Sequence, residues 1–109
     1  MDKDYLSGVD LNFNENVSKL SAFNLSFDLQ CNWHQLFHGA LYFSRISPDL
    51  VVIINHLGCL QFDRPDNSNI DYSSPENLKR LTEWQKGIIE FAKNQNVYIK
   101  LSMLQYCTP

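Results

Sequence analysis

Apolar and polar residues recur along the chain with two different periods, and these periods predict an alternation of helices and strands. Between Leu11 and Phe23 the apolar positions are spaced as on one face of a helix, with polar residues between them. From Leu25 to Gln30 the pattern changes to strict alternation, which predicts a strand. One face of this strand is apolar, and the other carries Ser26, Asp28 and Gln30.

The middle of the chain continues this alternation with a second helix and a second strand. Apolar residues recur at helical spacing from Gln35 to Ile46 and predict a helix. This helix ends close to Pro48, because the residue before a proline is pushed out of helical geometry. The segment from Leu50 to Asn55 is apolar on both faces, which is typical of a central parallel strand covered on both sides.

The last part of the chain contains a long polar segment, a helix and a strand. The segment from Gly58 to Asp71 is rich in polar and turn-forming residues, which favours a lid or binding loop; the alternative is an exposed tether. Ser74 as N-cap and Pro75 at the first helical position predict a helix that runs to about Asn94. The alternation from Val97 to Ser102 predicts a third strand.

The order of these elements predicts the fold class. Helices that alternate with strands indicate an α/β fold, in which parallel strands are joined by crossover helices. Three parallel strands alone leave two open edges and one uncovered face, and isolated proteins normally protect both. The pattern therefore predicts a single unit over residues 1–109 that is part of a larger α/β architecture.

Composition and charge narrow the classes of function. The chain has 109 residues, 44% of them hydrophobic and 13% aromatic, which is enough for a buried core. Its net charge is -3 and its basic residues do not cluster, so a nucleic-acid partner is not expected. The longest apolar run is far shorter than the roughly 18 to 20 residues that span a bilayer. We therefore expect a soluble, cytoplasmic protein with no membrane partner.

The cysteines do not follow a disulfide or zinc pattern. Cys31, Cys59 and Cys107 are odd in number and widely spaced, so reduced thiols are expected. Cys31 and Cys59 each follow a predicted strand end, which places them at the same rim of the sheet. Metal binding there is the alternative to a role as small buried apolar residues, and we favour the buried role.

Candidate chemistry gathers at the ends of the predicted strands. In parallel α/β folds the carboxyl ends of the strands form the pocket, and Gln30, His56 and Ser102 lie at or just past the three ends. Lys100 adds a cation to the same side. Two structural alternatives stand beside this hypothesis: His56 could be bonded to the backbone, and Lys100 could neutralise Asp28.

His34 and His38 are four residues apart, which on a helix places both imidazoles on one face, as in a zinc pair. The glutamate that serves as general base in such motifs is absent, because position 35 is Gln. No third ligand is indicated by the sequence. We therefore favour His34, near the strand end, as a ligand contact over a two-histidine metal site.

Six short motifs in one order resemble a known family. They are Leu25-Ser26-Phe27-Asp28-Leu29-Gln30, His34-Gln35-Leu36, Pro48-Asp49-Leu50, Asn55-His56-Leu57-Gly58, Trp84 before Lys86-Gly87, and Asn96-Val97-Tyr98-Ile99-Lys100-Leu101-Ser102. Together they resemble the amidohydrolase-related TIM-barrel hydrolases, which include sugar-lactone and pyrone-dicarboxylate lactonases. The resemblance implies a partial (β/α)₈ barrel, running from the helix after strand four to strand seven.

The resemblance also implies a set of roles. His56 would be the catalytic residue at the end of strand six, in contact with a divalent metal such as zinc or with the substrate carbonyl. Gln30, His34, Lys100 and Ser102 would bind a small lactone or related substrate. Water would attack the carbonyl while a Lewis acid or hydrogen-bond donors stabilise the oxyanion.

Two parts of the family pattern are missing from this chain. The His-x-His of strand one and the aspartate at the end of strand eight have no counterpart, and Met103 stands where a glycine commonly follows Lys-Leu-Ser. A complete barrel needs roughly 250 residues. We therefore expect a lactonase-like hydrolase fragment that is inactive alone. The alternative is a non-catalytic α/β module that binds a small ligand or self-associates through its open sheet edges.

Overall fold

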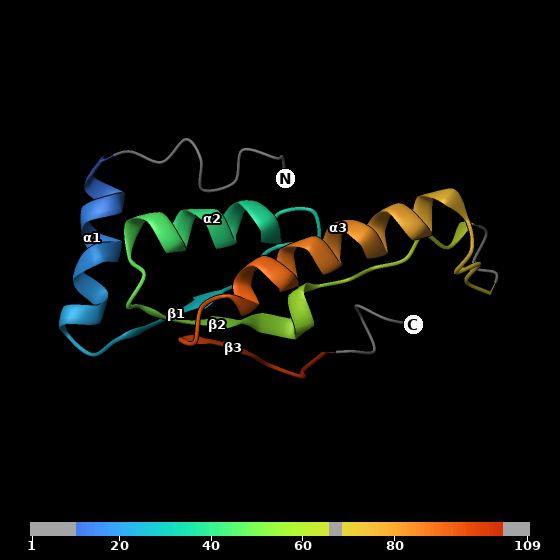
Figure 1. The fold of residues 1–109 in the computed structure, drawn as a ribbon. Helices are drawn as coiled ribbons and strands as arrows, with labels where there is room; N and C mark the ends of the chain where they lie inside the picture. The colour runs from blue at the N-terminus through green and yellow to red at the C-terminus, as the bar shows by residue number, and fades with distance from the viewer. Residues whose placement is uncertain (1–10, 66–68, 104–109) are drawn as a thin grey trace.

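A computed structural model describes residues 11–65 and 69–103 as helices alternating with the strands of one parallel sheet (Figure 1). The sheet has three strands in the order β1-β2-β3. The predicted α/β class and the parallel arrangement are therefore confirmed. The elements are α1 (Leu11–Ala22), β1 (Ser26–Leu29), α2 (Leu36–Ile46), β2 (Val51–Ile54), the 3₁₀ turn η1 (Asn55–Gly58), α3 (Pro75–Ala92) and β3 (Val97–Ile99).

The apolar face of the sheet is covered by two helices. Figure 1 shows α2 and α3 side by side over the same face of the strands. In the register, Leu29 lies opposite Ile54 and Ile54 opposite Ile99, so alternate residues of each strand point toward the helices. The central strand contributes most to the core, because Val52 and Ile54 are buried beneath the helices. Helix α1 crosses the end where the strands begin, and its Ser18 bonds to the last carbonyl of α2.

A glycine lets the two covering helices approach closely. A Cβ atom at Gly87 of α3 would lie near the Cβ atom of Leu36, and 2.9 Å from the backbone nitrogen of Phe37. Backbone atoms cannot move aside as the end of a flexible side chain can. Position 87 therefore has to be glycine for α2 and α3 to pack at this distance.

The start of α3 agrees with the prediction, whereas the start of α2 decides the position of His34. Ser74 caps α3 as predicted, since its hydroxyl accepts a hydrogen bond from the Asn77 backbone, and Pro75 begins the helix. Helix α2 begins only at Leu36, with Gln35 as its N-cap, so His34 lies in the preceding turn. The expectation that His34 and His38 share one helical face was wrong, because His34 is not part of the helix.

The second face of the sheet is not covered by any helix among residues 11–65 and 69–103. Asp28, Ile53 and Tyr98 lie in one row across this face, and Tyr98 is 60% exposed. Past β3, Leu101 is 72% exposed. The predicted cover on both faces of β2 is thus present on one face of the described structure. In the same described ranges, no helix is both long and apolar enough to cross a membrane.

Candidate functional site

The backbone adopts the left-handed conformation directly after β2 ends. His56 (φ 56°, ψ 43°), Leu57 (φ 53°, ψ 27°), Gly58 (φ 74°) and Cys59 (φ 50°, ψ 48°) are consecutive residues in the left-handed region. This conformation costs about 1 to 2 kcal/mol for each residue that has a Cβ atom. Strain of this kind persists only where the surroundings enforce it, and it is often found at functional sites.

Three contacts hold this left-handed turn. The indole Nε1 of Trp84 donates a 2.9 Å hydrogen bond to the Leu57 carbonyl oxygen, and the Leu57 backbone N–H donates a 2.9 Å bond to the carbonyl of Lys100. Gly58 adds a packing contact, because a Cβ atom there would lie 2.7 Å from Leu36 Cδ1 and would push the end of the leucine side chain aside. The turn is therefore fixed by α3 on one side and by the segment after β3 on the other.

The turn places His56 beside Ser102. The imidazole Nδ1 of His56 and the hydroxyl Oγ of Ser102 are 2.9 Å apart, within hydrogen-bonding distance, and both residues are half-buried. The structural alternative for His56, a hydrogen bond between its imidazole and the backbone, is not what the structure shows. The ends of β2 and β3 thus meet through two side chains that can exchange a proton.

Lys100 forms the ion pair that the structural alternative predicted. Its Nζ lies 3.1 Å from Oδ2 of Asp28, across the uncovered face of the sheet. The side chains are 47% and 51% exposed, so water screens the attraction and the pair adds little to stability. The ammonium is thus held at Asp28, and about half of the Lys100 side chain stays accessible to solvent.

Gln30 and His34 lie on the same rim as His56 but at the end of β1. Gln30 follows the last residue of β1 and is exposed. His34 packs edge-on against Trp33, with ring centroids 4.9 Å apart. His56 and Ser102, by contrast, are predicted site residues that contact each other directly from neighbouring strand ends.

A complete metal centre is not formed by the described side chains. No group of three His, Cys, Asp or Glu residues within the described ranges is arranged to hold a metal ion. The Oδ1 atom of Asn55, next to His56, is buried without a hydrogen-bond partner, but an amide oxygen and one imidazole do not make up a zinc ligand set. The described residues therefore do not fit a metal ion by themselves, and the metal role of His56 stays a prediction.

The two described cysteines differ in burial, with Cys31 buried and Cys59 half-buried. Cys31 is buried, and burial followed by the electrostatic effect of neighbouring Cys59 raises its pKa to about 12. This effect supports the expectation that both cysteines lie at the same rim. Cys107 lies outside the described residues.

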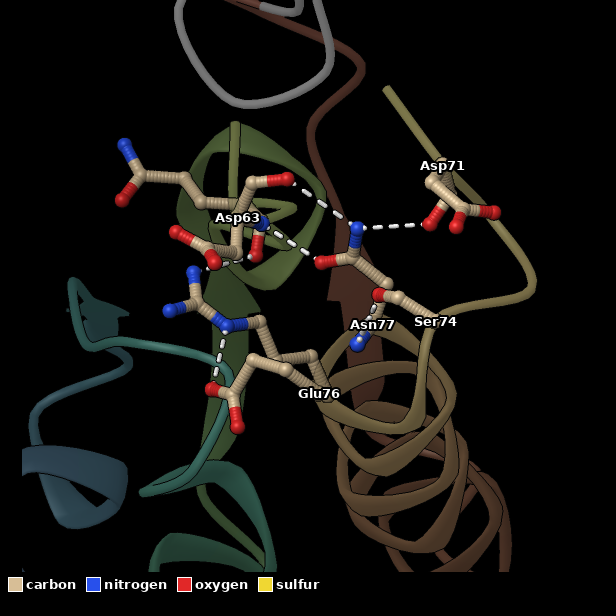
Figure 2. A network of polar contacts seen from close by, with 7 residues as sticks. Asp63, Asp71, Ser74, Glu76 and Asn77 are labelled. Carbon is tan, nitrogen blue, oxygen red and sulfur yellow. Dashed lines mark hydrogen bonds and ion pairs between the residues drawn. The ribbon is translucent and has the colours of Figure 1, made fainter. Parts of the chain in front are cut away.

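The polar segment after η1 is anchored by a residue that the sequence did not single out. The side chain of Asn77 is 2% exposed and forms three hydrogen bonds to the backbone of this segment (Figure 2). Its Oδ1 accepts from the Asp63 N–H, and its Nδ2 donates to the carbonyl oxygens of Asp63 and Asp71. Arg80 adds a bond to the Gln61 carbonyl. The two ends of the segment are thus tied to the start of α3, which argues against a loose tether.

Two hollows in the surface lie away from the His56–Ser102 pair. One, of about 410 Å³, is formed by the anchored segment and the start of α3. Two carboxyl groups line it: a hydrogen bond from Ser73 lowers the pKa of Asp71, and a hydrogen bond from Arg80 lowers the pKa of Glu76. The other, of about 450 Å³, lies at the far ends of α2 and α3, beside Phe43 and Phe91. Neither hollow includes a residue that the sequence predicted for the site.

The comparisons with known proteins identify one similar solved structure. No family model and no curated protein matches the chain. The solved structure of amidohydrolase 2 from Bifidobacterium longum subsp. infantis is 25% identical in sequence and aligns with a TM-score of 0.52. The alignment covers 84% of this chain and 30% of the amidohydrolase.

The chain has an amidohydrolase-like fold. Its parallel strands and alternating helices correspond to a part of that larger protein, so the predicted fold class is confirmed. The chain spans 30% of the length of the amidohydrolase. The lactonase subtype is not tested by this likeness.

Proposed function

We propose that the chain is one segment of a hydrolase that cleaves a lactone or an amide-like carbonyl, with His56 at its reacting centre. The observation that carries this proposal is the 2.9 Å contact between His56 and Ser102 on a strained turn at the carboxyl rim of the sheet. The amidohydrolase-like fold supports the reaction class, because the rim formed by strand ends is where such folds place their chemistry.

Each rim residue has a role that follows from its chemistry. His56 takes the proton of the attacking oxygen, as a general base must. The ammonium of Lys100 stabilises negative charge on the carbonyl oxygen, and it is exposed enough to leave Asp28 for a ligand. Gln30 and His34 contact the remainder of a small substrate. A divalent metal such as zinc would need ligands beyond the described residues, and we assign no step to it.

The test is hydrolysis of a sugar lactone by the chain mixed with a polypeptide that carries the remaining barrel strands, with acid release measured at constant pH. We expect His56→Asn to lower turnover by about 10² or more, the usual contribution of a general base. Asn is chosen because it tolerates the left-handed backbone. His38→Asn, on an exposed face of α2, is the matched control and keeps the wild-type rate. Equal rates in wild type and His56→Asn contradict the proposal.

We further propose that residues 1–109 form one incomplete barrel unit, which needs more strands for full activity. The test mixes the chain with a polypeptide that carries the remaining strands of the Bifidobacterium amidohydrolase. A gain in lactone hydrolysis that disappears with His56→Asn is the expected result. If the chain alone is as active as the mixture, the unit is sufficient by itself.

A non-catalytic module that self-associates is the second candidate, and the exposure of the sheet favours it. Ile99 and Leu101 are 38% and 72% exposed at the last strand, a site where a second copy could pair. Size-exclusion chromatography and a thermal melt decide between the candidates. A defined oligomer with a sharp transition, disrupted by Leu101→Lys, supports the module. A monomer with unchanged elution in Leu101→Lys contradicts it.

A further inference from the structure

We propose that Ser102 is a nucleophile, activated by His56, which carries the acyl group of an ester or lactone as a covalent intermediate. This inference rests on the proposed function, because it uses the same site and names the attacking oxygen. It changes the role of Ser102 from a substrate contact to a catalytic residue. It also requires no metal for the step that forms the intermediate.

The geometry is that of a nucleophile beside its base. Serine hydroxyls are activated when an imidazole nitrogen lies roughly 2.6 to 3.2 Å from Oγ, and Nδ1 of His56 lies at 2.9 Å. The backbone of His56 belongs to the turn that Trp84 fixes through the Leu57 carbonyl. A fixed backbone reduces the ordering that the base needs when the substrate binds.

A cation lies near Ser102 in the sequence. Lys100 lies two residues before Ser102, and its Nζ forms a 3.1 Å ion pair with Asp28 at the surface. When the substrate displaces Asp28, this ammonium stabilises the oxyanion that develops as the serine attacks a carbonyl. Ser102 and His56 are both half-buried, so a small ester can reach them.

The step balances without an external reagent other than water. Ser102 Oγ forms a bond to the carbonyl carbon, and its proton passes to Nδ1 of His56. The C–O bond to the leaving alcohol breaks, and the imidazolium returns the proton to that alcohol. Water then attacks the acyl-serine with His56 again as base, which releases the acid and restores the hydroxyl.

The experiment incubates the full chain with p-nitrophenyl acetate and, separately, with a fluorophosphonate probe, followed by peptide mapping. We expect one acetyl or phosphonyl group on Ser102 in the wild type, none on that position in Ser102→Ala, and labelling at least tenfold slower in His56→Asn. Ser26→Ala is the matched control, because Ser26 is an exposed serine at the other end of the sheet. It should label at the wild-type rate.

The remaining outcomes separate this inference from the proposed function. If the wild type hydrolyses the ester, His56→Asn does not, and Ser102 carries no adduct, then water attacks directly. In that case the nucleophile assignment is overturned and the proposed function stands. If the wild type shows neither hydrolysis nor labelling, even when it is mixed with the polypeptide that carries the remaining strands, both are overturned. If Ser102 is labelled as fast in His56→Asn as in the wild type, His56 does not activate it, and the inference is also overturned.

Discussion

Trp84 and Leu57 are joined by a 2.9 Å hydrogen bond from the indole Nε1 to the carbonyl oxygen. This bond connects helix α3 to the turn that presents His56. The Leu57 carbonyl belongs to a turn of four consecutive residues with positive φ, and a partly buried carbonyl needs a hydrogen-bond donor. The indole supplies the missing donor.

Replacing Trp84 by Phe should weaken the turn while keeping most of the packing. The half-buried Leu57 carbonyl loses its donor, which costs about 1 to 3 kcal/mol. We expect a lower free energy of unfolding in urea and a lower rate of ester hydrolysis. Trp33→Phe is the control, since the Trp33 ring packs against His34 and Arg80 through its faces and edges. Equal losses in the two variants would show that the indole bond does not matter.

The two helix glycines should respond in opposite ways to alanine. At Gly87 the new Cβ meets the backbone of α2, so we expect Gly87→Ala to destabilise the fold by about 1 to 3 kcal/mol, as overpacking does. At Gly39 the nearest atom is Leu29 Cδ2 at 3.4 Å, an ordinary contact. Gly39→Ala should therefore gain up to about 1 kcal/mol of helix propensity. Thermal melts of both variants measure the difference, and destabilisation of equal size contradicts the close helix contact.

Asn77→Ala should release the segment between Gly58 and α3. Its side chain satisfies backbone groups at Asp63 and Asp71, and its removal leaves them unpaired at a cost of about 1 to 3 kcal/mol. Gln85→Ala on the exposed face of the same helix is the control and should change stability by less than about 0.5 kcal/mol. Urea unfolding compares the two. Wild-type stability in Asn77→Ala would mean that the segment is held by other contacts.

The stability of the fold should fall with rising pH because of Cys31. Its pKa is raised from 9.0 to about 12 by burial, so above pH 9 the unfolded chain loses the thiol proton while the folded chain keeps it. The sign is therefore a loss of stability that begins near pH 9 and ends near pH 12, with a slope of roughly 1 kcal/mol per pH unit. The wild type should lose more stability than Cys31→Ala over this window. Parallel pH profiles of the two proteins would count against the assignment.

The fold was predictable from the sequence because its elements follow clear periods. The alternation from Leu25 to Gln30 and the N-cap pair Ser74-Pro75 are local signals, and the structure confirms both. The His34–His38 pair was misjudged, because a spacing of four says nothing about where a helix begins. The helix begins at Leu36, after Gln35 closes the preceding turn with a 2.8 Å bond to the Asn32 backbone.

The candidate site was only partly predictable. That His56 and Ser102 lie at neighbouring strand ends follows from the order of the strands, but their direct contact depends on the left-handed turn. Positive φ at His56 and Leu57 has no sequence signal other than the glycine that follows. The roles of Trp84 and Asn77 depend on tertiary contacts with segments far along the chain, which periodicity does not describe.

Leu36 lies against both glycines: its Cβ atom is next to Gly87 on α3, and its Cδ atoms are next to Gly58 in the turn. One core leucine therefore serves both the packing of the two helices and the turn that carries His56. A substitution that shortens Leu36 would remove side-chain contacts at both places at once, even though no residue of α2 or α3 takes part in the chemistry.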